Sequence, residues 1–206
     1  MSSLFSIRRG SAISQPAAVI ETESAQVPPN RYPKQRGALG TATGRIADVD
    51  EPESCYACQT SRSPSLPVRE EVYRSDDWRV AHAFDTSLPG WLIVLPVRHL
   101  SSMGQLTPSA AEELGRLLRA LSLVLERRLG ATKAYVMFFA EAEGFAHLHV
   151  HVVPRMPDQP ATERGPNIFA RLGGPDQLST DERDRVSADL RDAVTETLGD
   201  SHSAPS

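Results

Sequence analysis

The sequence predicts an α+β domain: a mostly antiparallel sheet with a long helix and a C-terminal helix packed on one of its faces. Three observations support this fold class. Short apolar segments are joined by turn-forming residues, one long segment repeats leucines at helical spacing, and a second helical segment lies near the end of the chain. The order of strands, long helix, strands and helix is typical of an antiparallel α+β domain.

The chain has 206 residues, of which 40% are hydrophobic, and this suits one domain with a sizeable core. Residues 1–52 are rich in Ser, Ala, Pro and Gly and show no sustained apolar period. Such a segment cannot bury enough apolar surface to offset the entropy that ordering removes. We therefore expect a disordered tail at 1–52, one domain at 53–199 and a short disordered tail at 200–206.

The first part of this domain predicts three strands. Residues 71–74 and 78–84 are rich in apolar and aromatic side chains, and the turn-forming segment 75–77 separates them, which predicts a strand pair. After a Pro-Gly turn at 89–90, residues 91–96 are almost continuously apolar and end in proline. A strand that is apolar on both faces is typical of the centre of a sheet.

A long helix follows. Thr107 can cap its first turn, Pro108 suits the first helical position, and Gly130 provides the stop. Apolar residues repeat at helical spacing between these limits: Leu114, Leu117, Leu118, Leu121, Val124 and Leu125. This pattern predicts an amphipathic helix with one face in the core.

Two more strands and a last helix complete the domain. Residues 134–140 and 147–153 are apolar segments joined by the short segment 141–144, and a hairpin is the simplest connection. Ser179 and Glu182 have the spacing of a capping box at the start of a helix. The apolar residues of this helix are Val186, Leu190, Ala193 and Val194.

The segment 147–153 contains three histidines at alternate positions, His147, His149 and His151. Side chains alternate between the two faces of a strand, so the three imidazoles should share one face. A rise of about 3.3 Å per residue separates neighbouring imidazoles by about 6.6 Å, so one metal ion cannot easily collect all three, although two could chelate an ion. Three unpaired imidazoles would be costly to bury, so we interpret this face as a chemical site.

The chain has two cysteines, Cys55 and Cys58, in a C-x-x-C pair. Such a pair can be a redox couple, half of a zinc site or a coincidence. A redox couple is expected to open a helix in a βαβ unit, whereas the segment 61–67 that follows here is rich in serine and proline. Zinc is therefore the favoured interpretation.

The charge balance excludes some classes of partner. A net charge of −4 and a pI of about 5.9 give no basis for non-specific binding to nucleic acid or to anionic membranes. No apolar run is long enough to span a bilayer, and the first ten residues lack a secretory apolar segment. We expect a cytoplasmic protein that binds small anionic ligands, with neither a nucleic acid nor a membrane as partner.

The histidine segment, the upstream segment 90–99 and the pair Phe84-Asp85 together resemble the histidine triad (HIT) family of nucleotide hydrolases and transferases. The resemblance covers roughly residues 53–160. It implies a HIT-like fold, a mostly antiparallel sheet with flanking helices, and assembly into a homodimer.

The resemblance also implies roles for individual residues. His149 would be the nucleophile that attacks the α-phosphate of a nucleoside phosphoanhydride or phosphoramidate, giving a nucleotidyl-histidine intermediate. His151 would contact the phosphate and help the leaving group, while Phe84 and Asp85 would lie near the base and the ribose. The implied substrates are dinucleoside polyphosphates or nucleoside phosphoramidates, with adenine as the expected base. Neutral imidazole is nucleophilic near neutral pH, which agrees with these roles.

Zinc-containing branches of the family place a C-x-x-C pair before the sheet and a histidine after the central strand, and they use the first triad histidine as the fourth ligand. The resemblance implies that one Zn²⁺ ion is held by Cys55, Cys58, His99 and His147. Four protein ligands leave no open coordination position, so this zinc would be structural.

The chain also departs from the family pattern. Several members have polar residues that hold phosphate just before the triad, where this chain has Gly-Phe-Ala at 144–146, and Trp91 replaces a histidine of one branch. These departures leave a second hypothesis open, a catalytically inactive, zinc-stabilised module that binds nucleotides or proteins. A third hypothesis is a hydrolase that uses the histidines as an open catalytic metal site.

Overall fold

The computed structural model describes residues 55–140 and 145–200. The expected tail at 1–52 lies outside the described residues. So does the expected tail at 200–206, apart from Asp200, which is the last residue of a helix.

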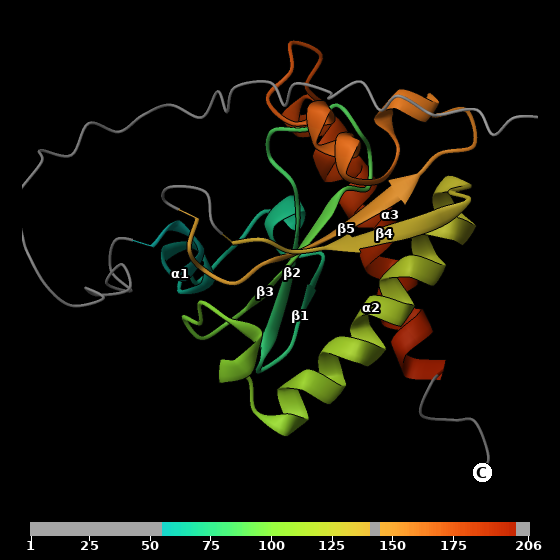
Figure 1. Cartoon of the computed structure of the whole chain (residues 1–206). Helices are drawn as coiled ribbons and strands as arrows, with labels where there is room; N and C mark the ends of the chain where they lie inside the picture. The colour runs from blue at the N-terminus through green and yellow to red at the C-terminus, as the bar shows by residue number, and fades with distance from the viewer. Residues whose placement is uncertain (1–54, 141–144, 201–206) are drawn as a thin grey trace, which may run out of the picture. The chain divides into compact units, whose positions relative to one another are not determined.

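Five antiparallel strands form one sheet in the order β1-β2-β3-β5-β4 (Figure 1). The strands are β1 (Tyr73–Arg74), β2 (Trp78–His82), β3 (Leu92–Pro96), β4 (Lys133–Met137) and β5 (Val150–Arg155). The expected α+β class and the central position of β3 are confirmed. The predicted pairing of the first two strands and that of the last two strands are also observed.

The helices are α1 (Tyr56–Ser61), α2 (Pro108–Leu129) and α3 (Thr180–Asp200). Short 3₁₀ turns lie at η1 (Val68–Glu70), η2 (Met103–Gln105), η3 (Ala161–Glu163) and η4 (Gly165–Arg171). Helix α1 was not predicted, because a six-residue helix shows too little periodicity to be recognised from the sequence. The described part of the chain contains no helix with the length and apolarity needed to span a membrane.

The limits of α2 and α3 follow the predicted capping signals. The Thr107 hydroxyl accepts a hydrogen bond from the Ala110 N–H at 3.2 Å, and Gly130 ends α2 in the left-handed conformation with φ 70°. At the start of α3, the Glu182 carboxylate accepts hydrogen bonds from the Ser179 N–H at 2.8 Å and from its hydroxyl at 2.7 Å. These contacts satisfy polar groups that a helix end leaves unpaired.

Both long helices pack on one face of the sheet, as predicted. The main hydrophobic core lies between that face and the helices, and its strand residues alternate along each strand as the pleat requires. Its central members are Val80, Leu92, Val94, Val150 and Val152 from the strands and Leu114, Leu117, Leu121, Leu125, Leu190 and Val194 from the helices.

The opposite face of the sheet carries the histidine site. Two smaller apolar clusters cover this face, one around α1 and one around η4. His151 pairs with Ile93 of β3 and Met137 of β4, so its side chain projects to this second face. One set of strand residues therefore builds the core, and the alternate set builds the site.

The predicted histidine strand is only partly correct. β5 begins at Val150, so His147 and His149 lie in an irregular segment before the strand and only His151 belongs to it. The preceding strand is also shorter than the predicted 134–140, since it ends at Met137. The Leu148 N–H donates to the Leu100 carbonyl at 2.6 Å instead of to a sheet neighbour, because this segment leaves the sheet towards the end of β3.

The turn between β2 and β3 requires a glycine at position 90. Gly90 has φ 80°, its N–H donates to His82 Nε2 at 3.0 Å, and an added Cβ would collide with the Leu129 side chain.

We predict that Gly90→Ala lowers the free energy of unfolding by about 1–3 kcal/mol, measured by urea denaturation. Gly115→Ala in the exposed middle of α2, where a Cβ meets no neighbour, should raise it by about 0.5–1 kcal/mol. Equal effects of the two substitutions would contradict this account of Gly90.

Candidate functional site

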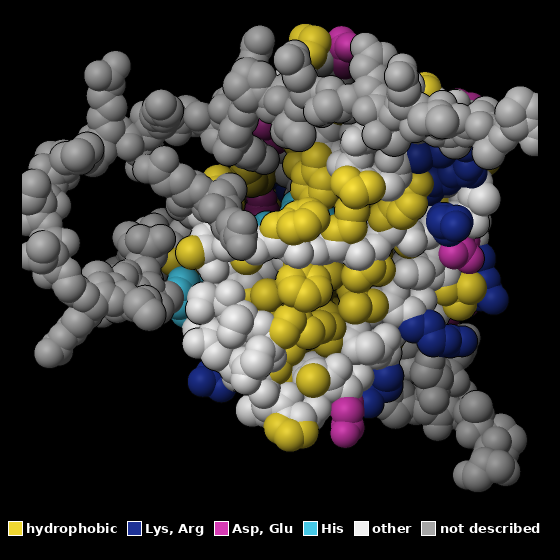
Figure 2. Space-filling view, viewed as in Figure 1, with side chains coloured by type: hydrophobic (Ala, Val, Ile, Leu, Met, Phe, Trp, Pro, Cys, Tyr) yellow, Lys and Arg dark blue, Asp and Glu magenta, His cyan; other side chains and the backbone are white. Residues whose placement is uncertain are grey.

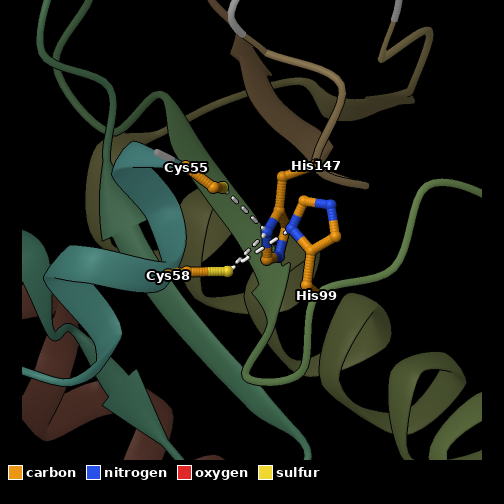
Figure 3. A group of neighbouring side chains, drawn as sticks. All are labelled: Cys55, Cys58, His99 and His147. Atoms are coloured by element: carbon orange, nitrogen blue, oxygen red, sulfur yellow. Dashed lines mark hydrogen bonds between the residues drawn. The ribbon is translucent and has the colours of Figure 1, made fainter. Parts of the chain in front are cut away.

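Four potential metal ligands converge where α1 approaches the ends of β3 and β5 (Figure 3). Cys55 and Cys58 come from the start of α1, His99 follows β3, and His147 precedes β5. The two sulfur atoms and the nearest ring nitrogens all lie within 4.8 Å of one another. The structure thus brings together the four residues that the sequence analysis named.

The distances within this cluster match a shared tetrahedral ion. Cys55 Sγ lies 3.4 Å and Cys58 Sγ lies 3.6 Å from His147 Nδ1, and Cys58 Sγ lies 3.4 Å from His99 Nδ1. Zn–S bonds of about 2.3 Å and Zn–N bonds of about 2.0–2.1 Å at a tetrahedral angle place sulfur and nitrogen about 3.6 Å apart. Neither cysteine forms a disulfide, so both sulfurs can act as ligands.

The protonation chemistry of the cluster also fits a dication. Burial raises the pKa of the Cys58 thiol to about 11, and the neighbouring Cys55 adds to this effect. Burial lowers the pKa of His147 to about 4, so its imidazole is neutral at physiological pH and can donate a lone pair. Buried thiolates are stable when a cation is bound between them, and a coordinating thiol is deprotonated by its metal. The Cys55, Cys58, His99 and His147 cluster fits a structural zinc site.

The His147 ring is oriented for coordination by a hydrogen bond on its far side. Its Nε2 lies 2.9 Å from the Pro96 carbonyl oxygen, which can only accept, so the ring proton is on Nε2. The Nδ1 lone pair then faces the two thiols. Such outer contacts commonly fix the tautomer and orientation of a metal-binding histidine.

Helix α1, which carries the cysteines, is tied to the sheet by a buried arginine. Arg79 of β2 is 1% exposed, and its Nε donates to the Ser61 hydroxyl at 3.1 Å. Its guanidinium also donates to the Glu70 carbonyl at 2.5 Å and lies 3.3 Å from the Glu70 carboxylate. A buried charge held by several acceptors keeps one geometry, so Arg79 fixes the position of α1 against β2.

His149 is oriented by the backbone of His147. Its Nδ1 lies 2.8 Å from the His147 carbonyl oxygen, which places the proton on Nδ1 and leaves the lone pair on Nε2. The ring is half-buried, and Nε2 has no hydrogen-bond partner among the described residues. An imidazole held in this way presents a nucleophilic nitrogen outward.

His151 lies beside His149, with 5.0 Å between the two ring centroids. This is shorter than the predicted spacing of about 6.6 Å, because His149 is outside the extended strand. Burial lowers the pKa of His151 to about 3, and His149 contributes further, so the ring is neutral. The three imidazoles therefore belong to two different groups. His147 lies in the cluster with the cysteines, whereas His149 and His151 contact each other.

The residues expected near a base and a ribose lie at the end of β2. Phe84 is 46% exposed and stacks on Phe145, with 6.3 Å between ring centroids, and its edge meets Tyr56 of α1 at 6.5 Å. Asp85 follows, and its carbonyl accepts a hydrogen bond from the Gly173 N–H at 3.0 Å. Phe84 is therefore part of an aromatic group between the cysteine helix and the segment before the triad.

Sequence reasoning missed the aromatic surroundings of His151. Trp91 Nε1 donates to His151 Nδ1 at 3.0 Å, and the Phe169 ring of η4 lies 4.9 Å from the His151 ring. Trp91 was noted only as a replacement for a histidine. Phe169 gave no signal, because it lies 18 positions after His151, in η4, and only the tertiary fold brings it back.

Comparisons with known proteins agree with this geometry. The HIT domain family model matches residues 69–158, a range that contains His99 and all three triad histidines. No curated protein sequence matches the chain.

Solved structures share the fold. A zinc-bound histidine triad family protein from Mycobacterium smegmatis is 19% identical, with a TM-score of 0.52 over 73% of this chain and 99% of the other. A hypothetical histidine triad nucleotide-binding protein from Sulfolobus tokodaii is 16% identical, with a TM-score of 0.54 over 69% of this chain and 93% of the other. A HIT-like protein from Bartonella henselae is 20% identical, with a TM-score of 0.51 over 65% and 90%. Residues 69–158 thus match the HIT domain family model, and solved histidine triad proteins share the fold of the chain.

Proposed function

We propose that the protein is a nucleotide hydrolase or nucleotidyltransferase that acts at the α-phosphate through a nucleotidyl-histidine intermediate on His149. One observation carries this proposal. The hydrogen bond from His149 Nδ1–H to the His147 carbonyl leaves the Nε2 lone pair without a partner among the described residues and beside His151. An imidazole held in one orientation with a free lone pair is what covalent catalysis at phosphorus requires.

The chemistry can be written as two displacements. The His149 Nε2 lone pair forms a bond to the α-phosphorus, and the bond from phosphorus to the leaving group breaks with its electron pair on the leaving group. Water or another acceptor then attacks phosphorus, the P–N bond breaks, and His149 returns as a neutral imidazole while the acceptor's proton passes to solvent. Phosphoryl chemistry depends mainly on positioning and on charge stabilisation, and rigid imidazoles can supply both.

In this proposal the structural zinc helps to orient His149. The ring of His147 belongs to the zinc cluster, and the carbonyl of the same residue holds His149. An ion in the cluster would fix the backbone at position 147 and, through it, the direction of the nucleophile. The described residues place neither His149 nor His151 in a metal cluster, which disfavours the hypothesis of an open catalytic metal site.

The substrate would be a nucleoside phosphoanhydride or phosphoramidate, with adenine as the favoured base. The exposed ring of Phe84 offers a stacking surface for a base, and the following Asp85 would meet the ribose hydroxyls. The Sulfolobus protein of the same fold is described as nucleotide-binding, which supports a nucleotide ligand here.

We also propose a homodimer. β4 is the last strand at one edge of the sheet, and large apolar side chains on or just after it are exposed: Val136 by 45%, Phe138 by 48% and Phe139 by 61%. Hydrophobic side chains gather on the face of the molecule seen in Figure 2. An exposed edge strand with apolar neighbours is a common surface for pairing with a second chain.

A catalytically inactive binding module is the second candidate. Phe145 and Ala146, the described residues just before the triad, carry no polar side chain that could hold a phosphate. Phe145 instead stacks on Phe84. Detection of the covalent intermediate separates this candidate from the enzyme.

We predict that His149→Ala lowers kcat/KM for diadenosine polyphosphates by at least about 10³-fold, because the attacking nitrogen is lost. Acid quenching of the wild-type reaction should trap one nucleoside monophosphate on the peptide that contains His149, detected by mass spectrometry. The variant should keep its zinc content and its unfolding midpoint. Full activity of a folded His149→Ala protein, or an adduct on another residue, would contradict the proposed role.

We predict that metal analysis finds about one zinc ion per chain. His99→Ala should lower the zinc affinity by more than about 100-fold, because removing a ligand should reduce the affinity more than removing an outer contact does. Chelation should reduce activity slowly and in parallel with unfolding, because the ion is structural.

The matched control for the zinc experiment is His149→Ala, which removes an imidazole from the same segment without removing a ligand. It should retain the ion. Immediate loss of activity on chelation, with the fold intact, would indicate a catalytic metal instead. A metal-free protein that folds and works normally would overturn the zinc assignment.

A further inference from the structure

The environment of His151 fixes the location of its single proton. Trp91 is fully buried, and its Nε1–H donates to His151 Nδ1 at 3.0 Å. An indole nitrogen is a donor only, so Nδ1 of His151 must be the acceptor. The neutral ring therefore carries its proton on Nε2.

Aromatic packing holds this arrangement in place. The ring centroids of Trp91 and His151 are 5.8 Å apart, and those of His151 and Phe169 are 4.9 Å apart, both with edge-to-face geometry. Phe169 also meets Trp91 at 5.5 Å. His151 itself is only 7% exposed, so its ring has no room to turn over without moving the buried Trp91 and the partly buried Phe169.

This arrangement prevents His151 from acting as an acid. A second proton would have to sit on Nδ1, where it would face the N–H of Trp91, and two donors cannot share a hydrogen bond. Burial opposes the charged ring as well. Release of the Nε2 proton would leave an imidazolate, because the indole N–H of Trp91 is too weakly acidic to pass its proton to Nδ1. His151 can thus share its proton in a hydrogen bond but cannot transfer it.

On the basis of the proposed function, we infer that Trp91 is a positioning residue that restricts the site to leaving groups that depart as stable anions. With a phosphoanhydride, the P–O bond breaks, the released phosphate keeps the electron pair as an anion, and His151 stabilises it through Nε2–H without losing the proton. With a phosphoramidate, the leaving nitrogen must gain a proton. His151 cannot supply it, and the His149 proton is held by the His147 carbonyl. The substrates are therefore nucleoside phosphoanhydrides in preference to phosphoramidates.

The first experiment measures the tautomer directly. Long-range ¹H–¹⁵N correlation spectra of the full chain, with the His151 signals assigned by comparison with His151→Gln, should show the Nε2–H tautomer at neutral pH. In Trp91→Phe, which keeps an aromatic ring but removes the donor, an Nδ1–H form should become populated. Phe169→Leu is the matched control, because it loosens the packing around His151 but keeps the indole N–H, and it should preserve the wild-type tautomer.

The second experiment measures selectivity between leaving groups. In the wild type, kcat/KM for a diadenosine polyphosphate should exceed that for adenosine phosphoramidate by at least about 10²-fold, the usual contribution of a general acid that is missing here. Trp91→Phe should narrow this ratio, because a freed Nδ1 lets His151 accept a second proton, while Phe169→Leu should leave the ratio unchanged. The ratio is informative even where absolute rates fall.

The outcomes separate this inference from the proposed function. If the wild type forms the His149 adduct but cleaves both substrates equally well, the inference is overturned and the proposed function remains. If no adduct forms and neither substrate reacts, the proposed function fails and the selectivity fails with it. An Nδ1–H tautomer or a charged His151 in the wild type overturns the inference whatever the activity, and this holds even if Trp91→Phe does not fold.

Discussion

The site depends on one residue that acts through two of its groups. The His147 ring lies against Cys55, Cys58 and His99, and its backbone carbonyl accepts the Nδ1 proton of His149. A hydrogen bond to a carbonyl fixes a tautomer only as well as the carbonyl itself is fixed. The four-residue cluster holds that peptide group at a point where the chain has left the sheet and its strand hydrogen bonds. The metal site and the proposed nucleophile thus share one stretch of backbone.

Side chains alternate between the two faces of the sheet, so one face carries the main core and the other carries the histidine site. On one face, valines and leucines of β2, β3 and β5 meet α2 and α3 in the main core. On the other face, the same strands present His151, Arg79 and the smaller clusters that seat α1 and η4. Because neighbouring residues of a strand point to different faces, the same strands support the site on one side and the core on the other.

His149 and His151 lie side by side but are held in opposite tautomers, because their hydrogen-bond partners at Nδ1 differ. His149 donates from Nδ1 to a carbonyl and so keeps a lone pair on Nε2. His151 accepts at Nδ1 from an indole and so keeps a proton on Nε2. One acceptor and one donor thus give two identical side chains opposite tautomers, with a lone pair on Nε2 of His149 and a proton on Nε2 of His151.

The sequence by itself determined the fold class, the strand pairs and the ends of the two long helices, but it did not reveal α1 or the limits of β4 and β5. Thr107, Gly130 and the Ser179–Glu182 pair fix helix ends through local hydrogen bonds and conformational preference, which act within a few residues and can therefore be recognised without a structure. The resemblance likewise named the four residues of the zinc cluster. The tertiary structure alone decided where β5 begins, that Phe169 returns to His151 and that Trp91 donates to it. These are contacts between segments distant in sequence, set by packing, and no local pattern encodes them.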